Sequence, residues 1–329
     1  WARAATAAAG PAFNFILSVI LFCSLFMWQG QFTDTLKINE LASLPGDYTL
    51  ELGDEIIAVN GLDVKNFKEF VSAGQNLTAP VNYTVRRDGR QIRAWGPVTY
   101  PALVSQVQPR SPAIEAGISV GDVITQIDGQ PISTFEDLKR LVVAAGDNEM
   151  VFSVWRFGVE FDVLLRSKSV AIPGTDGTLV NRRLVGISGD IFFKPGTEPL
   201  AFKVAISAAV TQTWKSIQWQ LVGLKQMILG SISACNISGP VEIAKIAGQV
   251  ASQGAAPFLA LIAGLSTAVG LMNLFPIPVL DGGHLVFCAV EAITGRKPSD
   301  SVVQFLMTLG LIIVLSLTAF SVVMNSVCP

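Results

Sequence analysis

The sequence predicts a polytopic α-helical membrane protein with two mixed α/β domains inserted between its transmembrane helices. Half of the 329 residues are hydrophobic and only 15% are charged, whereas soluble domains carry about 25% charged residues. Charge-free apolar runs lie near both ends of the chain, and the more polar middle contains an internal repeat. The net charge of −2 offers no basic surface for nucleic acid, so we expect no nucleic-acid partner.

Three apolar segments are predicted to cross the membrane. The first, residues 1–30, contains the charge-free run AFNFILSVILFCSLFMW from Ala12 to Trp28. About 20 residues cross a bilayer, and residues 4–10 can extend this run. The second segment, residues 255–294, is interrupted by a stretch with two prolines and an aspartate, and the third is residues 300–325.

The basic residues beside these segments predict their orientation. Arg3 precedes the first span, and Arg296 and Lys297 lie between the second and the third. With three spans, both basic sites fall on one side, which should be the cytoplasm because short basic flanks stay there. The long segment from Gln31 to Gln253 is then expected outside, together with the C-terminus.

The outer segment contains an internal repeat with an offset of 68 residues. LGDEIIAVNGLDVKNF (Leu52–Phe67) aligns with VGDVITQIDGQPISTF (Val120–Phe135). Each copy predicts a strand, an Asn-Gly or Asp-Gly turn, a short helix and a further strand. We place the two predicted domains at residues 31–97 and 98–170.

Residues 171–254 are predicted to form a connecting strand and amphipathic interfacial helices. Lys203, Lys215 and Lys225 would lie within about 120° of one another on a helix, beside Trp214 and Trp219. A basic stripe with aromatic neighbours is typical of a helix that lies in the membrane interface. If this helix spanned the membrane instead, the two basic flanks would fall on opposite sides.

NLFPIPVLDGGH, from Asn273 to His284, places an aspartate and two helix-breaking prolines in an apolar region. An ionisable residue inside a span is costly and indicates a functional site. Irregular backbone at membrane depth is tolerated where it lines protein or a water-filled cavity. The stretch therefore favours an inward-facing polar pocket. The alternative is a short loop in which Asp281 only caps a helix.

Two sets of motifs resemble known families. VQPRSPAIEAGISVGDVI (residues 107–124) resembles the PDZ-domain signature, and the first repeat shares its Gly-Asp part. NLFPIPVLDGG resembles the N-x-x-P-x-P-x-L-D-G motif of site-2 intramembrane metalloproteases. AAGPAFNFILSVILF (residues 8–22) and NISGPVEIAKIAG (residues 236–248) are similar to segments of that family's bacterial regulator-of-sigma-E protease branch.

The resemblance implies a Zn²⁺ cofactor and roles for individual residues. Asp281 would be a zinc ligand, and Asn273 would contact the substrate or the transition state. Pro276, Pro278 and Gly282 would contribute to substrate binding. The family's other zinc ligands are two histidines of an HExxH helix, but His284 is the single histidine of this sequence. Because the chain starts at Trp1, we expect the HExxH span to precede it.

The resemblance further implies a membrane-embedded zinc metalloendopeptidase of the bacterial inner membrane, although chloroplast-envelope relatives are an alternative. Its substrate would be a single-pass, membrane-anchored regulatory protein of the anti-sigma-factor type, cleaved within or near its transmembrane segment. Extracytoplasmic PDZ-like domains would gate access, by peptide binding to the second domain or by size exclusion. Membrane lipid is the other expected partner. The competing hypothesis is a non-catalytic membrane adaptor that presents PDZ domains.

Overall fold

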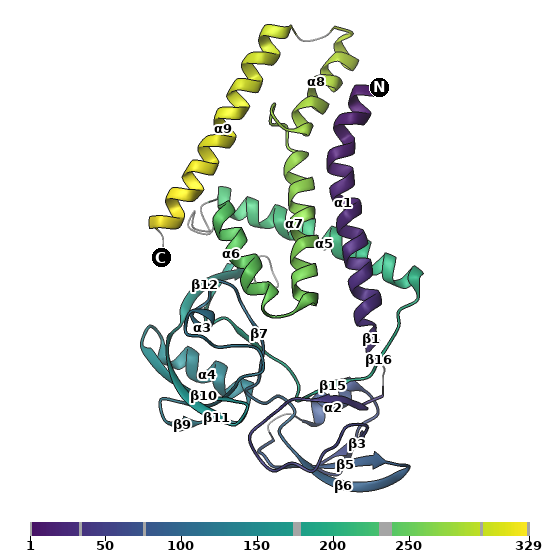
Figure 1. Ribbon diagram of the computed structural model, residues 1–329, viewed down its shortest axis with the longest axis vertical. Helices are drawn as coiled ribbons and strands as arrows, with labels where there is room; N and C mark the ends of the chain where they lie inside the picture. The colour runs from purple at the N-terminus through teal and green to yellow at the C-terminus, as the bar shows by residue number, and fades with distance from the viewer. Residues whose placement is uncertain are drawn as a thin grey trace. The chain divides into compact units, whose positions relative to one another are not determined.

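The computed structural model describes residues 2–32, 35–74, 77–173, 179–229, 239–296 and 299–327. The chain divides into two compact units, which are described separately. The helical unit comprises residues 1–29 and 199–329, and the outer unit comprises residues 30–198. The ends of the chain thus build one unit and its middle builds the other (Figure 1).

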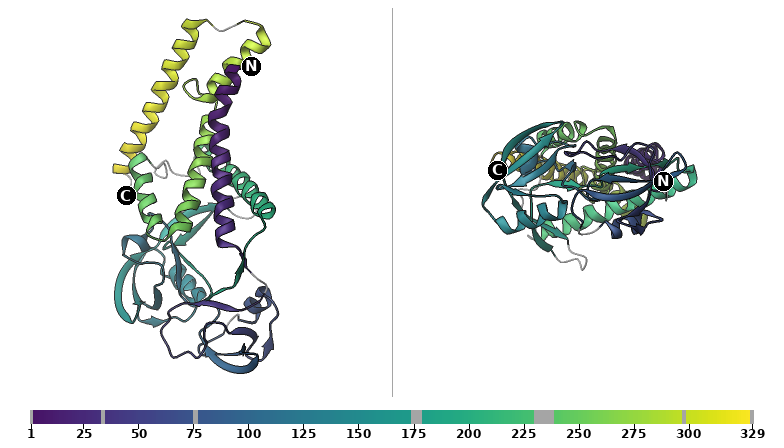
Figure 2. Two further views of the ribbon diagram at one scale, coloured as in Figure 1. Left: turned by 45° about the vertical axis from the view of Figure 1, so that its right-hand side comes forward. Right: turned by 90° about the horizontal axis from the view of Figure 1, so that it is seen from below.

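The helical unit confirms the predicted polytopic membrane fold. In the described part of this unit, three helices are long and apolar enough to cross a membrane: Ala2–Gln29, Ala255–Asn273 and Asp300–Val323. The helices in the described part of this unit are α1 (Ala2–Gln29), α5 (Phe202–Ile228), α6 (Pro240–Ala251), α7 (Ala255–Asn273), α8 (Asp281–Thr294) and α9 (Asp300–Val327). α1 and α7 run side by side, and α5 crosses both (Figures 1 and 2).

Small residues and buried hydroxyl groups join α1, α5 and α7. Ala205, Ala209 and Ala263 are fully buried in the core that they share with Phe22 and Leu25 of α1. Small side chains of this kind let membrane helices approach closely. At the same crossing, the buried Ser18 hydroxyl lies 2.7 Å from that of Thr267 and 3.3 Å from that of Thr213. One polar cluster therefore connects all three helices.

The outer unit confirms the predicted repeat, with one four-stranded sheet in each lobe. The strand order is β4-β3-β5-β6 in the first lobe and β11-β10-β8-β9 in the second. The first lobe contains β2 (Ile38–Leu41), β3 (Glu55–Val59), β4 (Leu62–Asp63), α2 (Phe67–Ala73), β5 (Val81–Arg87) and β6 (Arg90–Gly96). The second contains β7 (Val104–Val107), α3 (Pro112–Glu115), β8 (Val123–Ile127), β9 (Gln130–Pro131), α4 (Phe135–Ala145), β10 (Glu149–Arg156) and β11 (Val159–Arg166). These are the two mixed α/β PDZ-like domains.

The repeated Gly-Asp pair has the same structural role in both lobes. The fully buried Asp54 accepts two hydrogen bonds from Arg87, of 2.7 and 2.8 Å, and one of 2.9 Å from the Glu51 backbone N–H. Asp122 accepts the corresponding bonds from Arg156, of 2.6 and 2.8 Å, and from the Ser119 N–H. A buried charge of this kind is stable only when it is paired and hydrogen-bonded, which explains why the repeat retains both partners.

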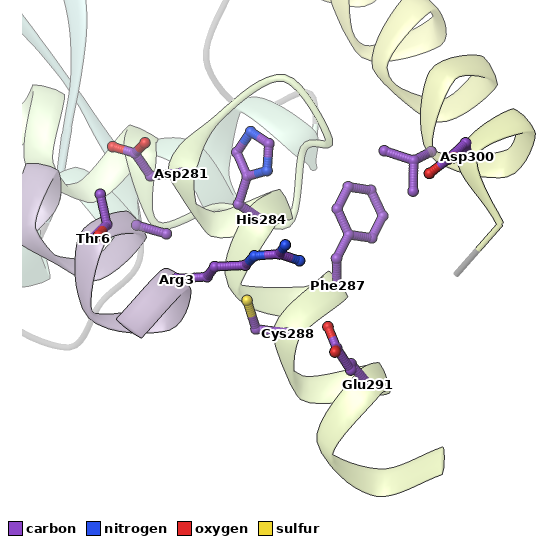
Figure 3. Close-up of a pocket in the computed structure, with 10 residues that line it drawn as sticks. Arg3, Thr6, Asp281, His284, Phe287, Cys288, Glu291 and Asp300 are labelled. Carbon is purple, nitrogen blue, oxygen red and sulfur yellow. The ribbon is translucent and has the colours of Figure 1, made fainter. Parts of the chain in front are cut away.

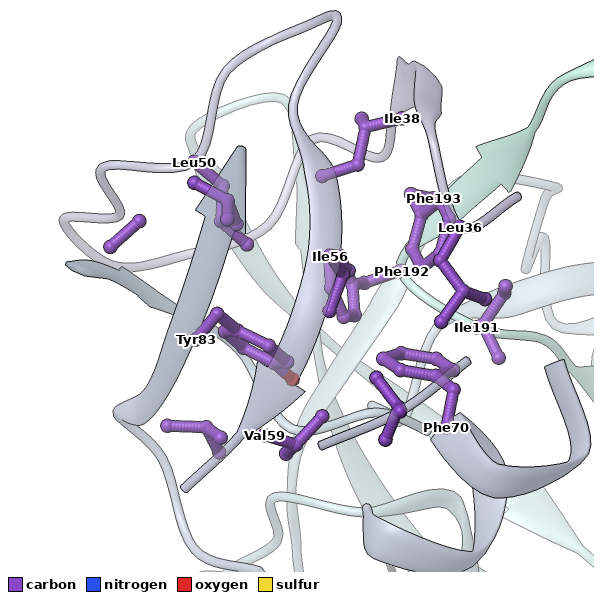
Figure 4. Close-up of a cluster of buried hydrophobic side chains, with 14 of the residues drawn as sticks. Leu36, Ile38, Leu50, Ile56, Val59, Phe70, Tyr83, Ile191, Phe192 and Phe193 are labelled. Atoms are coloured by element: carbon purple, nitrogen blue, oxygen red, sulfur yellow. The ribbon is translucent and has the colours of Figure 1, made fainter. Parts of the chain in front are cut away.

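The connecting strand that was predicted after residue 170 is, in the structure, a segment that adds strands to both lobes. After the β12–β13 hairpin (Lys168–Pro173 and Leu179–Leu184), β14 (Ile187–Gly189) pairs antiparallel with β7. β15 (Phe193–Pro195) then pairs with β2 of the first lobe, and β16 (Thr197–Glu198) pairs with β1 (Gln31–Phe32). Phe192 and Phe193 complete the buried core of the first lobe beside Phe70 and Tyr83 (Figure 4).

Several sequence-based expectations stay predictions. The domain limits at residues 97, 170 and 254 are among them, as is the interfacial position of α5. Two residues of the predicted patterns lie outside the residues that the structure describes. They are Lys297, which bears on the membrane orientation, and Asn236, which bears on the family resemblance.

Replacement of Arg87 by Met should lower the free energy of unfolding by about 3 kcal/mol at pH 7, because it leaves Asp54 buried without its counter-ion. Burial alone would raise the pKa of Asp54, but the hydrogen bonds from Arg87 and the Glu51 N–H lower it below its usual value. A lowered folded-state pKa stabilises the fold above the unfolded-state pKa, so this contribution should fade below about pH 4. Urea titration of the purified chain at pH 7 and pH 3 measures both effects.

Arg86→Met is the matched control, because Arg86 pairs with Glu55 at the surface, where the two side chains are 45% and 32% exposed. Exposed pairs contribute about 0–1 kcal/mol. Equal losses in the two variants would contradict the assigned role of the Asp54–Arg87 pair.

Candidate functional site

The NLFPIPVLDGGH motif forms a compact loop between two helices that follow one another along the bundle (Figure 1). Asn273 is the last residue of α7, and Asp281 is the first residue of α8. Between them, Ile277 N–H donates to the Phe275 carbonyl at 2.7 Å, and Leu280 N–H donates to the Ile277 carbonyl at 2.8 Å. These turns satisfy backbone groups in place of the helical bonds that Pro276 and Pro278 prevent.

The two glycines after Asp281 let this loop pack directly on the start of α8. A Cβ atom on Gly282 would lie 2.3 Å from the Phe275 carbonyl oxygen, and one on Gly283 would lie 2.4 Å from the Ile277 carbonyl oxygen. Both glycines are helical and buried. Their role is therefore to allow the close approach of two backbone segments.

Glycines of α1 and α9 approach the motif from two further sides. An added Cβ at Gly10 of α1 would lie 2.4 Å from the Asp281 Oδ2 atom. At Gly310 of α9, an added Cβ would lie 3.1 Å from the backbone nitrogen of Val279. At Gly10 and Gly310, α1 and α9 thus approach the aspartate and its loop closely, with little space for a larger residue.

The structure corrects one of the two local interpretations of Asp281. It is not the N-cap of α8, because Leu280 holds that position without a side-chain hydrogen bond. The carboxylate instead lies in the first turn, where the helix dipole favours negative charge. It receives no hydrogen bond or ion pair from any other residue in the described part of the chain.

Asp281 lines a cavity of about 550 Å³ between the starts of α1, α8 and α9. Figure 3 shows Asp281 and His284 on the first turn of α8, with Arg3 and Thr6 on the adjoining end of α1. The lining residues are Arg3, Thr6, Ala7, Asp281, His284, Phe287, Cys288, Glu291, Asp300 and Val303. The His284 ring packs edge-to-face on Phe287, with centroids 6.2 Å apart. Helices far apart in the sequence thus form one polar cavity.

The predicted site residues occupy the same short stretch but different environments. Asn273 is half-buried at the end of α7, and Pro276 is exposed on the loop. Pro278 is half-buried and contacts the region of α9 near Gly310, where its Cδ lies 3.4 Å from an added Cβ. Among the five predicted site residues, Asp281 is the one that lines the cavity.

The donor atoms at this site fit one position of a zinc centre. A carboxylate oxygen is a usual zinc ligand, and catalytic zinc generally has three protein ligands. Among the described residues, no three His, Cys, Asp or Glu side chains gather closely enough to hold a metal ion. Asp281 could therefore supply one ligand of a site that further residues complete.

A second hollow lies in the second PDZ-like lobe, between α4 and the segment 181–187. It has a volume of about 550 Å³, and the apolar residues Phe135, Leu138 and Val142 of α4 form one wall. Arg183 lies on the opposite wall and pairs with Asp147 at 2.8 Å. An extended peptide could enter this groove beside β14, as PDZ-type recognition requires.

Sequence reasoning missed the residues of α1 that hold α7 and the motif in place. Ser266 of α7 donates to the Asn14 carbonyl at 2.8 Å, and the Asn14 amide donates to the Gly10 carbonyl at 3.3 Å. An added Cβ at Gly270 would lie 3.0 Å from Asn14 Cβ. The sequence signal was the Gly10-Pro11 pair within a membrane span, but the partners of these residues lie more than 250 positions away.

Known proteins that resemble this chain are metalloproteases. The family model for peptidase family M50 matches residues 1–317. The regulator of sigma-E protease RseP of Escherichia coli strain K12 is 31% identical over 96% of this chain and 76% of its own length. A Rhizobium meliloti protein provisionally named a zinc metalloprotease is 28% identical over 98% of this chain and 68% of its own length.

One solved structure among the matches is the PDZ domain of an SdrC-like protein from Listeria monocytogenes. It is 19% identical, with a TM-score of 0.22, over 29% of this chain and 93% of its own length. The strand order of the two lobes and their repeated motifs identify them as PDZ-like. Since the family model covers nearly the whole chain, the protein belongs to peptidase family M50 and is a membrane metalloprotease.

Proposed function

We propose that this protein is an intramembrane zinc metalloprotease that cleaves membrane-anchored regulatory proteins within or near their transmembrane segment. The family match over residues 1–317 carries this proposal, and it favours an enzyme over a non-catalytic adaptor. The name of the E. coli relative, regulator of sigma-E protease, supports a substrate of the anti-sigma-factor type.

Asp281 is the proposed zinc ligand of this chain. Bound zinc would activate a water molecule by lowering its pKa. Asp281 lies in the first turn of α8, and the close contact with Gly10 restricts the orientation of its carboxylate. The two histidines and the glutamate that the family resemblance implies are not among these 329 residues.

Asn273, Pro276, Pro278 and Gly282 are the proposed substrate-contacting residues. The side-chain amide of Asn273 can donate a hydrogen bond to a peptide carbonyl or to the oxyanion that forms from it. Pro276 and Pro278 leave the loop backbone non-helical, so that it can lie against an unwound substrate segment. Gly282 keeps the loop tight against Asp281.

The PDZ-like lobes are proposed to control access of substrates. The groove of the second lobe supports binding of a peptide from the substrate's outer region, in addition to simple size exclusion. The basic flanks Arg3 and Arg296 support a cytoplasmic location for one end of the spans and an extracytoplasmic location for the outer unit. We place the protein in a bacterial inner membrane.

The first test is the zinc content of the complete gene product and of its Asp281→Asn variant. We expect about one zinc per chain in the native protein and at least a tenfold lower content in the variant, because second-shell changes alone already cost 10–100-fold in metal affinity. Elemental analysis of the purified protein measures this.

Asp300→Asn is the matched control, since Asp300 lines the same cavity from α9. It should retain its zinc. If neither the native protein nor the Asp300 variant contained zinc, the proposed cofactor would be wrong.

Replacement of Gly10 by Ala should lower proteolytic activity by about tenfold or more, because the new Cβ would displace the Asp281 carboxylate. Gly264→Ala on α7 is the control, since an added Cβ there meets nothing within 4 Å. Cleavage of a membrane-anchored model substrate in detergent measures both. Similar activity of the two variants would argue against a role for the Gly10–Asp281 contact.

Asn273→Ala should reduce kcat about a hundredfold with little change in KM, as expected when one transition-state hydrogen-bond donor is lost. The neighbouring Met272, 48% exposed, offers a control substitution to Ala. A loss in KM alone would instead assign Asn273 to ground-state substrate binding.

A further inference from the structure

Helix α5 carries an unusual charge pattern for a segment of a membrane unit. Its 27 residues contain Lys203, Lys215 and Lys225 but no acidic residue. All three lysines are exposed, and among the described residues none of them forms an ion pair. The helix therefore presents positive charge that the described part of the protein does not neutralise.

Four polar residues form a continuous ridge on this helix: Lys203, Ser207, Thr211 and Lys215. They are spaced four residues apart, so each lies next to the previous one on the same face. The ridge rises about 18 Å along the helix axis. The opposite face, with Ala205, Ala209 and Thr213, is buried, so packing against the other helices fixes the direction in which the ridge points.

A shallow groove of about 570 Å³ runs along this ridge. It is lined by Phe26 of α1 and by Lys203, Val204, Ser207, Ala208, Thr211, Gln212 and Lys215 of α5. The ammonium groups and the Ser207 hydroxyl can donate hydrogen bonds, whereas Thr211 already donates its hydroxyl to the Ser207 carbonyl at 2.9 Å. The groove thus combines donors for an anion with an apolar floor.

The side chains around the ridge include exposed apolar ones, which a helix face in contact with water alone would not require. Val204, Val210 and Trp214 lie among the lysines and are 50%, 52% and 59% exposed. Apolar and aromatic side chains interleaved with lysines are typical of a helix at a membrane surface, where the apolar parts enter the lipid and the ammonium groups meet headgroups.

We propose that this groove binds the headgroups of anionic phospholipids, with Lys203 and Lys215 at its two ends each pairing with a phosphate and with Phe26 and Val204 contacting the apolar part. Charge complementarity commits the site to an anionic lipid, since zwitterionic headgroups would leave the lysines unneutralised. The Ser18–Thr213–Thr267 cluster holds α5 against α1 and α7, so a bound lipid would anchor the whole bundle. This site is independent of the proposed catalytic role.

The test compares lipid retention by the full chain, exchanged into mixed vesicles of phosphatidylglycerol and phosphatidylcholine and then analysed by native mass spectrometry. The native chain should retain phosphatidylglycerol preferentially. The double variant Lys203→Gln/Lys215→Gln should reduce this preference by about fivefold for each lysine. Lys139→Gln/Lys168→Gln removes the same charge from the outer unit and should leave the preference unchanged.

Three outcomes would overturn the proposal. One is equal loss of preference in both double variants, which would indicate a net-charge effect. Another is equal retention of the two lipids by the native chain, which would leave only an apolar contact. The third is displacement of phosphatidylglycerol by inorganic phosphate, which would indicate a site for free anions. Unchanged circular dichroism of each variant confirms that the fold is intact.

Discussion

The close approach of backbone segments around the NLFPIPVLDGGH loop is the constraint on which the site in the helical unit depends. A charged side chain and a non-helical loop are both unfavourable in lipid, so they persist only where protein surrounds them. Here the protein backbone comes close to the motif because four positions have no side chain. They are Gly10 on α1, Gly282 and Gly283 on α8, and Gly310 on α9. A Cβ atom at Gly282 or Gly283 would clash with the backbone of the loop, and one at Gly10 would clash with the Asp281 carboxylate. The same glycines therefore determine both how closely the helices pack and how the site is shaped.

In the outer unit, the constraint is the burial of a charged aspartate in each lobe. Each lobe has one buried aspartate, just before β3 or β8, whose charge is paired by an arginine on the neighbouring strand of the sheet, β5 or β10. The pairing ties the loop before β3 or β8 to the end of β5 or β10. The lobes contain no cysteine, and Cys23 and Cys288 of the helical unit are free thiols among the described residues.

Local patterns predicted the elements of this protein, but not the contacts between distant segments. The spans follow from runs without charge, and the lobes follow from a repeat that keeps glycine where the backbone requires positive φ, as at Gly61 and Gly129. β14 and β15 have three residues each, too few to show a period of two. The contact between Gly10 and Asp281 depends on how three helices meet, and no local pattern encodes it. The NLFPIPVLDGGH motif is recognisable in the sequence because its residues are adjacent.

The short ladder between β1 and β16 has a consequence for how this protein could have been assembled. Gln31 and Glu198 are direct partners in it, so the chain enters and leaves the outer unit at points that lie about 5 Å apart. A segment whose ends meet in this way can be inserted into a host, or deleted from it, without separating the helices on either side. The outer unit thus has the topology of an insertion between α1 and α5.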